Sequence, residues 1–342
     1  MLSLTEKLSR DALDELTFHF APQIVLATAL KLDIFPAMAK GAKSVESIAS
    51  ATECSTRGVR MLLNCMASLG LLEKNHERYG LNNFSRRYFL PSSGDYIGGL
   101  LAQGDQLMEL WLTLPETVRT GKPSLSFWTD GESSSFNIDI VDGLFRVHKG
   151  CAWRLVEILQ GTPYFLTKRR ASIKILDAAA GSAVWSIPFA LKFERAKITA
   201  VDFFPVLAVA KRYTRQFGVQ DRYRFLGGNI REIDLGRGEY DLVLLGHICH
   251  SEGAHWSQEL IAKCFRALRN SGRLCIMDYV PDEERKSATL PLLLALNALL
   301  GTREGDTFTF SEYRQWLMSA GFSAVQTIEI SGHSPVMVGL KS

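Results

Sequence analysis

The chain has 342 residues, of which 46% are hydrophobic and 22% charged, and its formal net charge is +3. These values are typical of a globular protein with room for two domains, and they argue against a disordered chain or a dedicated polyanion binder. The six cysteines form no CxxC pair, which favours reduced thiols and a cytoplasmic location. The longest uncharged apolar run, residues 288–300, is too short to span a membrane, and the polar N-terminus has no signal-peptide core.

The first hundred residues predict a small helical domain. Apolar residues recur at helical spacing up to residue 40, and Ser44 is the expected N-cap of the next helix. A further helix runs from Thr56 and ends at Gly70, followed by a β-hairpin that turns at 75–78. Two short helices and a hairpin predict a winged helix-turn-helix.

A winged helix raises the alternative of a DNA-binding regulator. Arg57 and Arg60 lie near the start of the second helix, where DNA readers place basic residues. The rest of that helix is largely apolar, whereas DNA readers carry more Lys and Arg to neutralise phosphates. We therefore interpret the element as a packing module and expect no nucleic-acid partner.

Residues 97–165 again predict helices, with breaks at 121–123 and in the loop 129–135. The segment is rich in Trp, Phe and Met, which predicts core or dimer contacts and a wall for a flat apolar ligand. The basic run 168–170 marks the expected domain boundary.

From residue 171 the pattern changes to alternating strands and helices, which predicts a mostly parallel, doubly wound α/β sheet. Two final β runs have no helix between them and a hairpin-like link at 331–334, so the last strand should return antiparallel. The expected strands are 173–177, 198–202, 223–226, 240–245, 273–279, 323–330 and 335–340, and the expected helices are 184–193, 206–217 and 257–269.

The first of these strands opens a nucleotide-type site. It ends in Asp177, and the small residues that follow, including Gly181, predict a tight turn into a helix. The second strand ends in Asp202, 21 residues after Gly181. An acid at that spacing is placed to accept both hydroxyls of a ribose. The absence of GxGxxG and the antiparallel end of the sheet disfavour a dinucleotide-binding oxidoreductase.

The chain resembles the class I S-adenosylmethionine (SAM)-dependent O-methyltransferases that carry an N-terminal winged-helix dimerisation domain, a family with plant caffeate-type and bacterial natural-product and hydroxyneurosporene-type members. The resemblance covers nearly the whole chain and rests on six segments in the family's order. They are LDAAAGSAVWSIPFA, ITAVDFF, RYRFLGGNIREID, YDLVLLGHICH, ALRNSGRLCIMDYVPDE and GDTFTFSEYRQWLMSAGF.

The resemblance implies SAM as cofactor and a set of residues that bind it. Asp177 and Gly181 match the motif facing the methionine part, and Asp202 matches the acid that binds the ribose. The other implied contacts are Phe203, Asn229 and Ile230 at the adenine and Gly246 and His247 near the sulfonium. The chain departs from the family in having Asn229 for an acid and Ala at positions 179, 180 and 183 for glycines.

His250 is the expected catalytic residue. The segment ICH matches the family's segment whose last His deprotonates the acceptor hydroxyl. An imidazole suits this role because its ordinary pKa of about 6.5 leaves it largely neutral and basic at cytosolic pH. The acid that orients His250 stays open among Asp278, Glu304 and Asp306. His247, His250 and His255 with Asp278 also raise a metal alternative, but no spacing fixes a ligand set, and we predict no metal.

We predict a homodimeric SAM-dependent methyltransferase that acts on a hydroxyl of a flat, largely apolar small molecule in natural-product metabolism. Residues 1–168 should form the dimerisation and acceptor-pocket domain and residues 169–342 the Rossmann-like SAM-binding domain. Trp111, Phe145 and Leu294 are the expected acceptor contacts. The alternatives are an N- or C-methyltransferase, a SAM-binding enzyme that transfers no methyl group, and a winged-helix regulator with a decayed SAM site.

Overall fold

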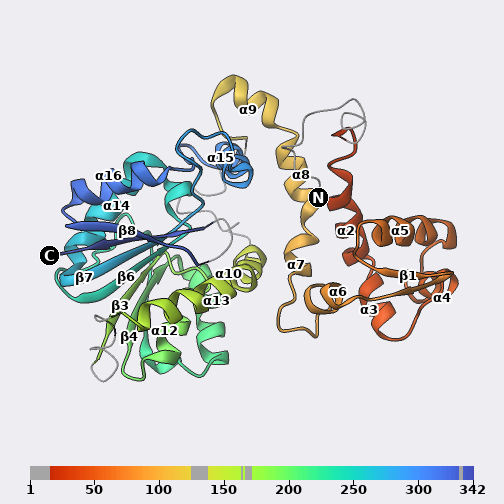
Figure 1. Cartoon of the computed structure of the whole chain (residues 1–342), viewed down its shortest axis with the longest axis horizontal. Helices are drawn as coiled ribbons and strands as arrows, with labels where there is room; N and C mark the ends of the chain where they lie inside the picture. The colour runs from red at the N-terminus through yellow and green to blue at the C-terminus, as the bar shows by residue number, and fades with distance from the viewer. Residues whose placement is uncertain (1–15, 125–137, 163–164, 166–171, 331–333) are drawn as a thin grey trace. The chain divides into compact units, whose positions relative to one another are not determined.

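The computed structural model describes residues 16–124, 138–162, 165, 172–330 and 334–342. The chain divides into two compact units, Met1–Glu109 and Leu110–Ser342. Figure 1 gives the element labels used below. Predicted features at 1–15, 129–135, 168–170 and 331–333 lie outside the described residues.

The N-terminal unit is helical with one small hairpin. Its elements are α2 (Ala21–Lys31), α3 (Ile34–Ala39), α4 (Val45–Ala51), α5 (Thr56–Ser68), β1 (Glu73–Asn75), β2 (Arg78–Gly80), α6 (Asn83–Tyr88), α7 (Gly98–Leu101) and the greater part of α8 (Gly104–Trp111). The hairpin is antiparallel with Asn75 opposite Arg78, at the predicted turn.

The predicted helix ends of this unit are confirmed. Ser44 forms a capping box with Ser47 at the start of α4, and the Ser55 side chain caps α5. After α5 the chain passes through Gly70, whose φ of 72° suits a residue without a side chain. The fully buried Phe35 and Leu63 anchor the core of the unit.

The C-terminal unit contains a seven-stranded sheet with the order β5-β4-β3-β6-β7-β9-β8. The first five strands in this order are parallel, and β9 runs antiparallel to both of its neighbours. The strands are β3 (Lys174–Ala178), β4 (Lys197–Asp202), β5 (Tyr223–Gly227), β6 (Tyr240–Gly246), β7 (Leu268–Met277), β8 (Ala324–Ile328) and β9 (Val336–Leu340). The predicted fold class is confirmed, including its antiparallel C-terminal hairpin.

Helices cover both faces of this sheet, and Figure 1 shows α14 and α16 on one side and α12 and α13 on the other. The helical elements are α9 (Leu114–Thr120), α10 (Ile138–Gln160), α12 (Ile187–Lys192), α13 (Phe204–Gln216), the 3-10 helix η1 (Gln220–Arg222), α14 (Cys249–Ala267), α15 (Thr289–Gly301) and α16 (Phe310–Ala320). The predicted break at 121–123 is present, because Gly121 ends α9 in the left-handed conformation.

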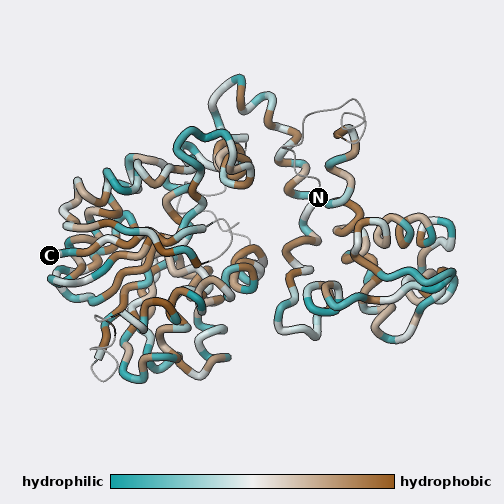
Figure 2. Tube along the Cα trace, viewed as in Figure 1, coloured by the Kyte–Doolittle hydropathy of each residue, from teal (hydrophilic) through white to brown (hydrophobic). Residues whose placement is uncertain are grey.

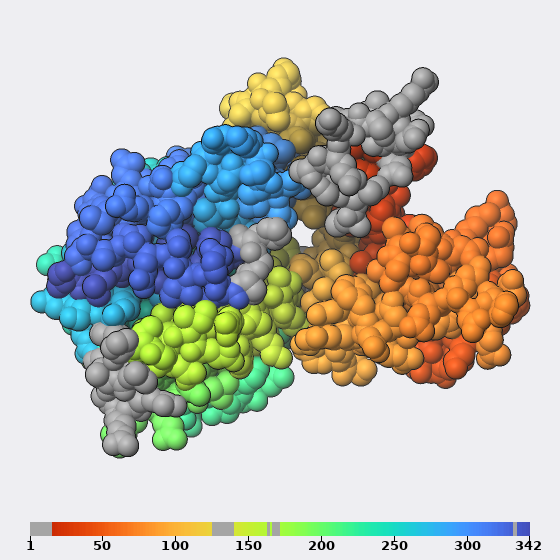
Figure 3. Space-filling model, viewed as in Figure 1, coloured from red at the N-terminus to blue at the C-terminus, as the bar shows by residue number. Residues whose placement is uncertain are grey.

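Alternate residues of the strands pack into two hydrophobic cores, one on each face of the sheet. On β6, Leu242 and Leu244 pack on the face covered by α10, α12 and α13, while Val243 and Leu245 pack on the face covered by α14 and α16. The central strands are therefore mostly hydrophobic, as Figure 2 shows. In Figure 3 the packed side chains close over the sheet that the ribbon leaves open to view.

Two predicted boundaries differ in a way that matters for the site. The helix predicted at 257–269 corresponds to α14, which has a short helical turn that begins at Cys249 and a longer helix after a kink at Gly253, whose φ of 77° is not helical. His250 therefore lies on the first turn of α14 and not in a loop. The strand predicted at 273–279 ends at Met277, so Asp278 directly follows it.

The six cysteines are free thiols, as predicted, and three of them are buried in the core. Among the described residues, no helix combines the length and the apolar character that a membrane span requires.

Candidate active site

The candidate site lies where the carboxyl ends of the parallel strands meet. The chain winds outward from β3 through β4 to β5 and then continues with β6 on the other side of β3. Ligands of doubly wound sheets bind in the crevice that such a reversal creates. Asp177, Asp202, Gly246 and Asp278 all stand at or just after strand ends along this edge.

The turn after β3 has the geometry of a close backbone approach. Gly181 has a φ of 54°, and a methyl group built on it would meet no atom within 4 Å, so the space beside its backbone is open. Ala183 also has a positive φ, of 60°, but it is fully buried in the core. The methyl group at position 183 therefore packs inside the protein.

Asp202 holds this turn from the end of β4. One carboxylate oxygen accepts a hydrogen bond from the Gly181 N–H at 2.8 Å, and the other accepts from the Phe203 N–H at 2.8 Å. Each carboxylate oxygen keeps a further lone pair for a ligand hydroxyl. Burial raises the pKa of Asp202 to about 6, although these two backbone hydrogen bonds oppose the shift.

Asp177 is still more buried, with an exposed fraction of 1%. Its carboxylate accepts a hydrogen bond from the Ser186 hydroxyl. Burial raises its pKa to about 7, the Ser186 hydrogen bond opposes the shift, and the nearby Asp202 adds to it. This edge of the sheet thus holds two carboxyl groups that favour the protonated form or a positively charged ligand.

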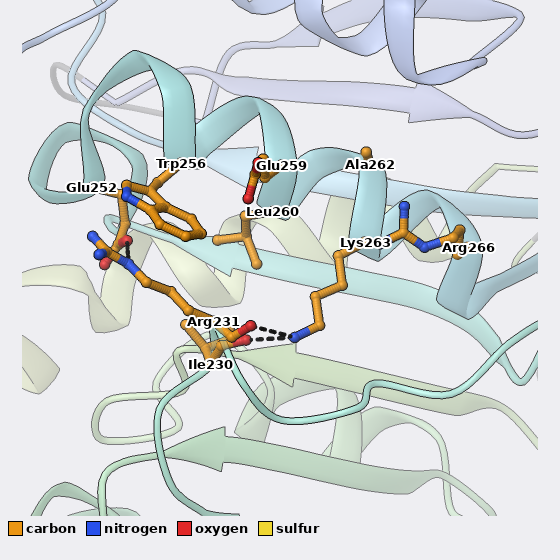
Figure 4. A pocket seen from close by; sticks show the side chains of 9 residues that line it. All are labelled: Ile230, Arg231, Glu252, Trp256, Glu259, Leu260, Ala262, Lys263 and Arg266. Atoms are coloured by element: carbon orange, nitrogen blue, oxygen red, sulfur yellow. Dashed lines mark hydrogen bonds and ion pairs between the residues drawn. The ribbon is translucent and has the colours of Figure 1, made fainter. Parts of the chain in front are cut away.

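Side chains of α14 hold the loop after β5 in place. Lys263 donates hydrogen bonds to the carbonyls of Ile230 at 2.8 Å and Arg231 at 3.1 Å. Arg231 pairs with Glu252 at 2.6 Å and lies over the Trp256 ring at 4.4 Å. Figure 4 shows these side chains around a cavity of about 390 Å³. The nine residues that line this cavity do not include His250.

Asn229 precedes this loop and uses its side chain locally. Its side-chain oxygen accepts the Arg231 N–H at 3.0 Å, which stabilises the turn. Ile230 is buried, with an exposed fraction of 8%.

His250 is held by a buried carboxylate. Its Nδ1 lies 2.7 Å from Oδ1 of Asp278, whose side chain is fully buried, while the His250 side chain keeps 20% of its surface exposed. Asp278 also accepts the His250 N–H at 3.1 Å, the Tyr279 N–H at 2.9 Å and the Tyr313 hydroxyl at 3.0 Å. Four donors on one carboxylate make a fully satisfied buried anion.

The two groups shift each other's pKa. Burial disfavours the charged imidazole, but the charge of Asp278 and its hydrogen bond outweigh burial and raise the pKa of His250 above its ordinary value of 6.5. Burial likewise opposes the charge on Asp278, but His250 lowers the pKa of this carboxyl to about 2. Of the three acids left open by the sequence, Asp278 is the one that contacts the ring. Asp306 instead donates its backbone N–H to the His250 carbonyl at 2.9 Å.

A second group of rings lies beside this pair. His247, in the turn after β6 with φ 55°, stacks on His148 of α10 with ring centroids 4.1 Å apart. The His247 ring is also 4.7 Å from Tyr279 and 5.9 Å from Trp185. Gly246 is required for this packing, because a side chain there would collide with Trp185.

Family models match two parts of the chain. An O-methyltransferase dimerisation domain matches residues 14–91, and an O-methyltransferase domain matches residues 168–323, so that together they cover more than half of the chain. The chain belongs to this O-methyltransferase family.

Individual relatives match over nearly the full length. The chain is 29% identical to the tetracenomycin polyketide synthesis 8-O-methyl transferase of Streptomyces glaucescens, over 96% of this chain and 95% of the relative. It is 26% identical to the 3-hydroxy-5-methyl-1-naphthoate 3-O-methyltransferase of Streptomyces sahachiroi, over 93% and 91% of the two chains. The solved structure of human N-acetylserotonin methyltransferase in complex with SAM has the same fold, with a TM-score of 0.83, 22% identity and full coverage of both chains.

The protein is therefore a SAM-dependent O-methyltransferase of the natural-product type. The residues at the strand ends fit the donor in chemical type. The backbone at Gly181 leaves open space, Asp202 presents carboxylate oxygens, and the buried Asp177 favours a nearby positive charge.

Three residues of this O-methyltransferase, His247, His250 and Asp278, place potential metal-ligand atoms within 4.8 Å of one another. The Asp278 oxygen nearest to His247 is 3.8 Å from its Nδ1 and is already hydrogen-bonded to His250. The arrangement is thus explained by the hydrogen bond between His250 and Asp278. His255 stands apart, paired with Glu259 on the exposed side of α14.

The three residues expected at the acceptor have different surroundings. Trp111, the last residue of α8, and Leu294 of α15 are partly buried. Phe145 is 3% exposed and stacks on Tyr213 with ring centroids 3.7 Å apart, so its ring serves the packing of α10 on α13.

Sequence reasoning missed three contributors to the site: His148, Tyr313 and Lys263. Each lies among other polar residues on an amphipathic helix, and no spacing separates it from ordinary surface or core positions. Only the fold brings them to the strand ends.

Proposed function

We propose that this enzyme methylates a hydroxyl group on a flat, largely apolar small molecule and that His250 takes up the proton. The single observation that carries the proposal is the 2.7 Å contact between His250 Nδ1 and the buried Asp278. It supports one tautomer, in which Nδ1–H is donated to the carboxylate and Nε2 is the basic nitrogen.

The proposed mechanism needs little more from the protein than alignment and a base. SAM supplies an activated methyl group on its sulfonium. His250 Nε2 would accept the hydroxyl proton as the acceptor oxygen takes the methyl group and the methyl–sulfur bond breaks, which leaves S-adenosylhomocysteine, and Asp278 would stabilise the imidazolium. The raised pKa of His250 favours holding this proton until the product leaves.

The donor-holding residues belong to the same proposal. Asp202 is placed to accept the ribose hydroxyls, with Phe203, Asn229 and Ile230 at the adenine. Asp177 and Gly181 would face the methionine part, and the backbone of Gly246 and His247 the sulfonium. The support is their shared position along one edge of the sheet.

The proposed class of acceptor rests on the names of two relatives and on the aromatic side chains near His250. The two Streptomyces relatives are named for tetracenomycin and a naphthoate. In this chain the Tyr279 ring lies 5.9 Å from the His250 ring, and Trp111 and Leu294 are candidate outer contacts. A flat phenol is the class that this supports.

We also propose a homodimer, with residues 1–168 for dimerisation and acceptor binding and 169–342 for SAM. The dimerisation-domain match supports it, as do the exposed Phe18, Phe20 and Leu107 in the N-terminal unit. Light scattering coupled to gel filtration tests it, and a monomer at micromolar concentration contradicts it.

The test of the base is His250→Gln, which keeps volume and polarity but removes the basic nitrogen. We expect turnover of a phenolic acceptor to fall by about 10²–10⁴-fold, the usual contribution of general-base catalysis, with SAM affinity by calorimetry nearly unchanged. His255→Gln, at an exposed histidine on the same helix, is the matched control. Equal turnover in both variants would remove His250 from the mechanism.

A further inference from the structure

Two stacked histidines beside the reaction centre have unused hydrogen-bonding groups. His148 is 7% exposed, and the His247 side chain is 10% exposed. Within the described part of the chain, no partner is found for Nε2 of His148 or for either ring nitrogen of His247. The contact from His247 Nδ1 to Asp278, at 3.8 Å, is too long for a hydrogen bond.

Such groups are costly if nothing satisfies them. A buried polar group without a partner costs about 1–3 kcal/mol, and three such nitrogens lie within one stacked pair. Leu or Phe at these positions would fill the same space without this cost. The arrangement therefore indicates a partner that enters the site from outside the protein.

The position of the pair says where that partner binds. The His247 ring centroid lies 6.3 Å from that of His250 and 4.7 Å from that of Tyr279. A flat ring that presents a hydroxyl to His250 would thus place a neighbouring substituent within reach of His247 and His148.

The charge state of His148 and His247 indicates the chemical class of the partner. Burial, followed by the charge of His250, lowers the pKa of His148 to about 4, and burial, followed by His148, lowers that of His247 well below its ordinary value. Both rings are therefore neutral near pH 7, and each offers one donor and one acceptor. Neutral rings suit an uncharged oxygen group better than a carboxylate or an ammonium.

We propose that His148 and His247 form a polar subsite for a second, uncharged oxygen substituent, a hydroxyl or a carbonyl, adjacent to the hydroxyl that is methylated. The inference rests on the proposed function, since it takes the methylated hydroxyl to lie at His250. It makes His148 and His247 specificity-determining residues, because an acceptor without the second oxygen leaves their nitrogens unpaired.

The experiment compares 2,3-dihydroxynaphthalene with 2-naphthol, which differ only in the second hydroxyl. In the wild-type enzyme we expect the diol to be favoured in kcat/KM by about 10-fold or more, beyond the factor of two from its second methylatable group. Binding of both compounds to the enzyme loaded with S-adenosylhomocysteine is measured by calorimetry, because this readout does not depend on turnover.

Two variants separate the subsite from simple packing. His148→Phe keeps a ring to stack on His247 but removes the nitrogens, so the preference for the diol should fall by about 10-fold in both readouts. His148→Gln places an amide where Nε2 stands and should retain most of the preference. Melting temperature and S-adenosylhomocysteine affinity, measured for each variant, report folding and the donor site.

The possible outcomes distinguish failure of the subsite from failure of the proposed function. An unchanged preference in His148→Phe, or equal or absent binding of the two compounds by the wild type, overturns the subsite. Loss of S-adenosylhomocysteine affinity in His148→Phe also overturns it, since the pair would then serve the donor. Selective binding of the diol without turnover would support the subsite and count against the proposed phenol methylation, whereas turnover without preference would do the reverse.

Discussion

Three buried carboxyl groups stand along the carboxyl edge of the sheet, and their pKa values are shifted in opposite directions. Asp278, after β7, has a pKa of about 2 because the charge and the hydrogen bond of His250 outweigh burial. Asp177 and Asp202, at β3 and β4, have pKa values of about 7 and 6, since burial outweighs the neutral donors around them.

The difference separates the His250 side of the site, around Asp278, from the donor side, around Asp177 and Asp202. On the His250 side the charges are balanced within the protein, so the imidazole ring is oriented before any ligand arrives. On the donor side we infer that the positive charges of SAM complete the balance. Variants that change one side at a time test this contrast.

Asp278→Asn should disrupt the His250 side of the site. The amide cannot compensate an imidazolium or fix the tautomer as a carboxylate does, so we expect kcat/KM to fall on the order of 100-fold or more. Removing the carboxylate leaves burial as the main influence, so the pKa of His250 should fall. The acid limb of the kcat/KM–pH profile should then move to lower pH.

The matched control for Asp278→Asn is Tyr313→Phe, which removes one hydrogen bond to the same carboxylate and leaves its charge. It should lower stability by about 1 kcal/mol with a much smaller kinetic effect. An acid limb that stays in place in Asp278→Asn would contradict the assigned pairing.

Asp202→Asn should weaken SAM binding on the donor side of the site. An amide offers one acceptor oxygen for two ribose hydroxyls, so the dissociation constant for SAM in calorimetry should rise about 10- to 100-fold. At saturating SAM, turnover should change little, because His250 is untouched. Asp221→Asn, at an exposed carboxyl, is the control, and an unchanged SAM affinity in Asp202→Asn would exclude the ribose role.

The pH dependence of stability should distinguish the donor side from the His250 side directly. Because the folded-state pKa of Asp177 is raised, its contribution to stability is full below pH 4 and is lost as pH rises toward 7. Without ligand, Asp177→Asn should therefore gain stability relative to wild type as pH rises from 5 to 8. A relative gain of about 2–4 °C in melting temperature corresponds to ~1 kcal/mol in a unit of this size.

Asp278→Asn should change stability in a lower pH range. The lowered pKa of Asp278 means that its contribution is present above pH 4 and is lost as pH falls toward 2. Relative to wild type, Asp278→Asn should therefore gain stability as pH falls from 4 to 2, whereas Asp177→Asn gains it as pH rises from 5 to 8. An unchanged relative stability of Asp278→Asn between pH 4 and 2 would contradict the contrast between the two sides of the site.

The smallest effect is expected at the loop after β5. Lys263→Met frees the carbonyls of Ile230 and Arg231, and the loosened adenine segment should raise the dissociation constant for SAM about 3- to 10-fold. Lys341 donates to the carbonyls of Phe265 and Leu268 in the same manner at another place. Lys341→Met should therefore affect stability but not SAM affinity, and a similar loss of affinity in both variants would deny Lys263 a positioning role.

Local patterns in the sequence predicted the order of elements, the sheet with its antiparallel end, and the positions of Asp177 and Asp202 at the ends of β3 and β4. These follow from local patterns, because hydrophobic periodicity and small-residue turns are written in consecutive residues. The helical turn that carries His250 escaped this reasoning, since it is short and the non-helical Gly253 separates it from the rest of α14.

Only the tertiary structure decided which acid holds His250, that Ala183 faces the core, and that Phe145 packs on Tyr213. It alone brought His148 from α10 onto His247, a contact across about a hundred residues of sequence. The physical reason is that side-chain pairing and pKa depend on three-dimensional distance and burial, which residues far apart in the chain acquire only when the sheet and its helices pack together.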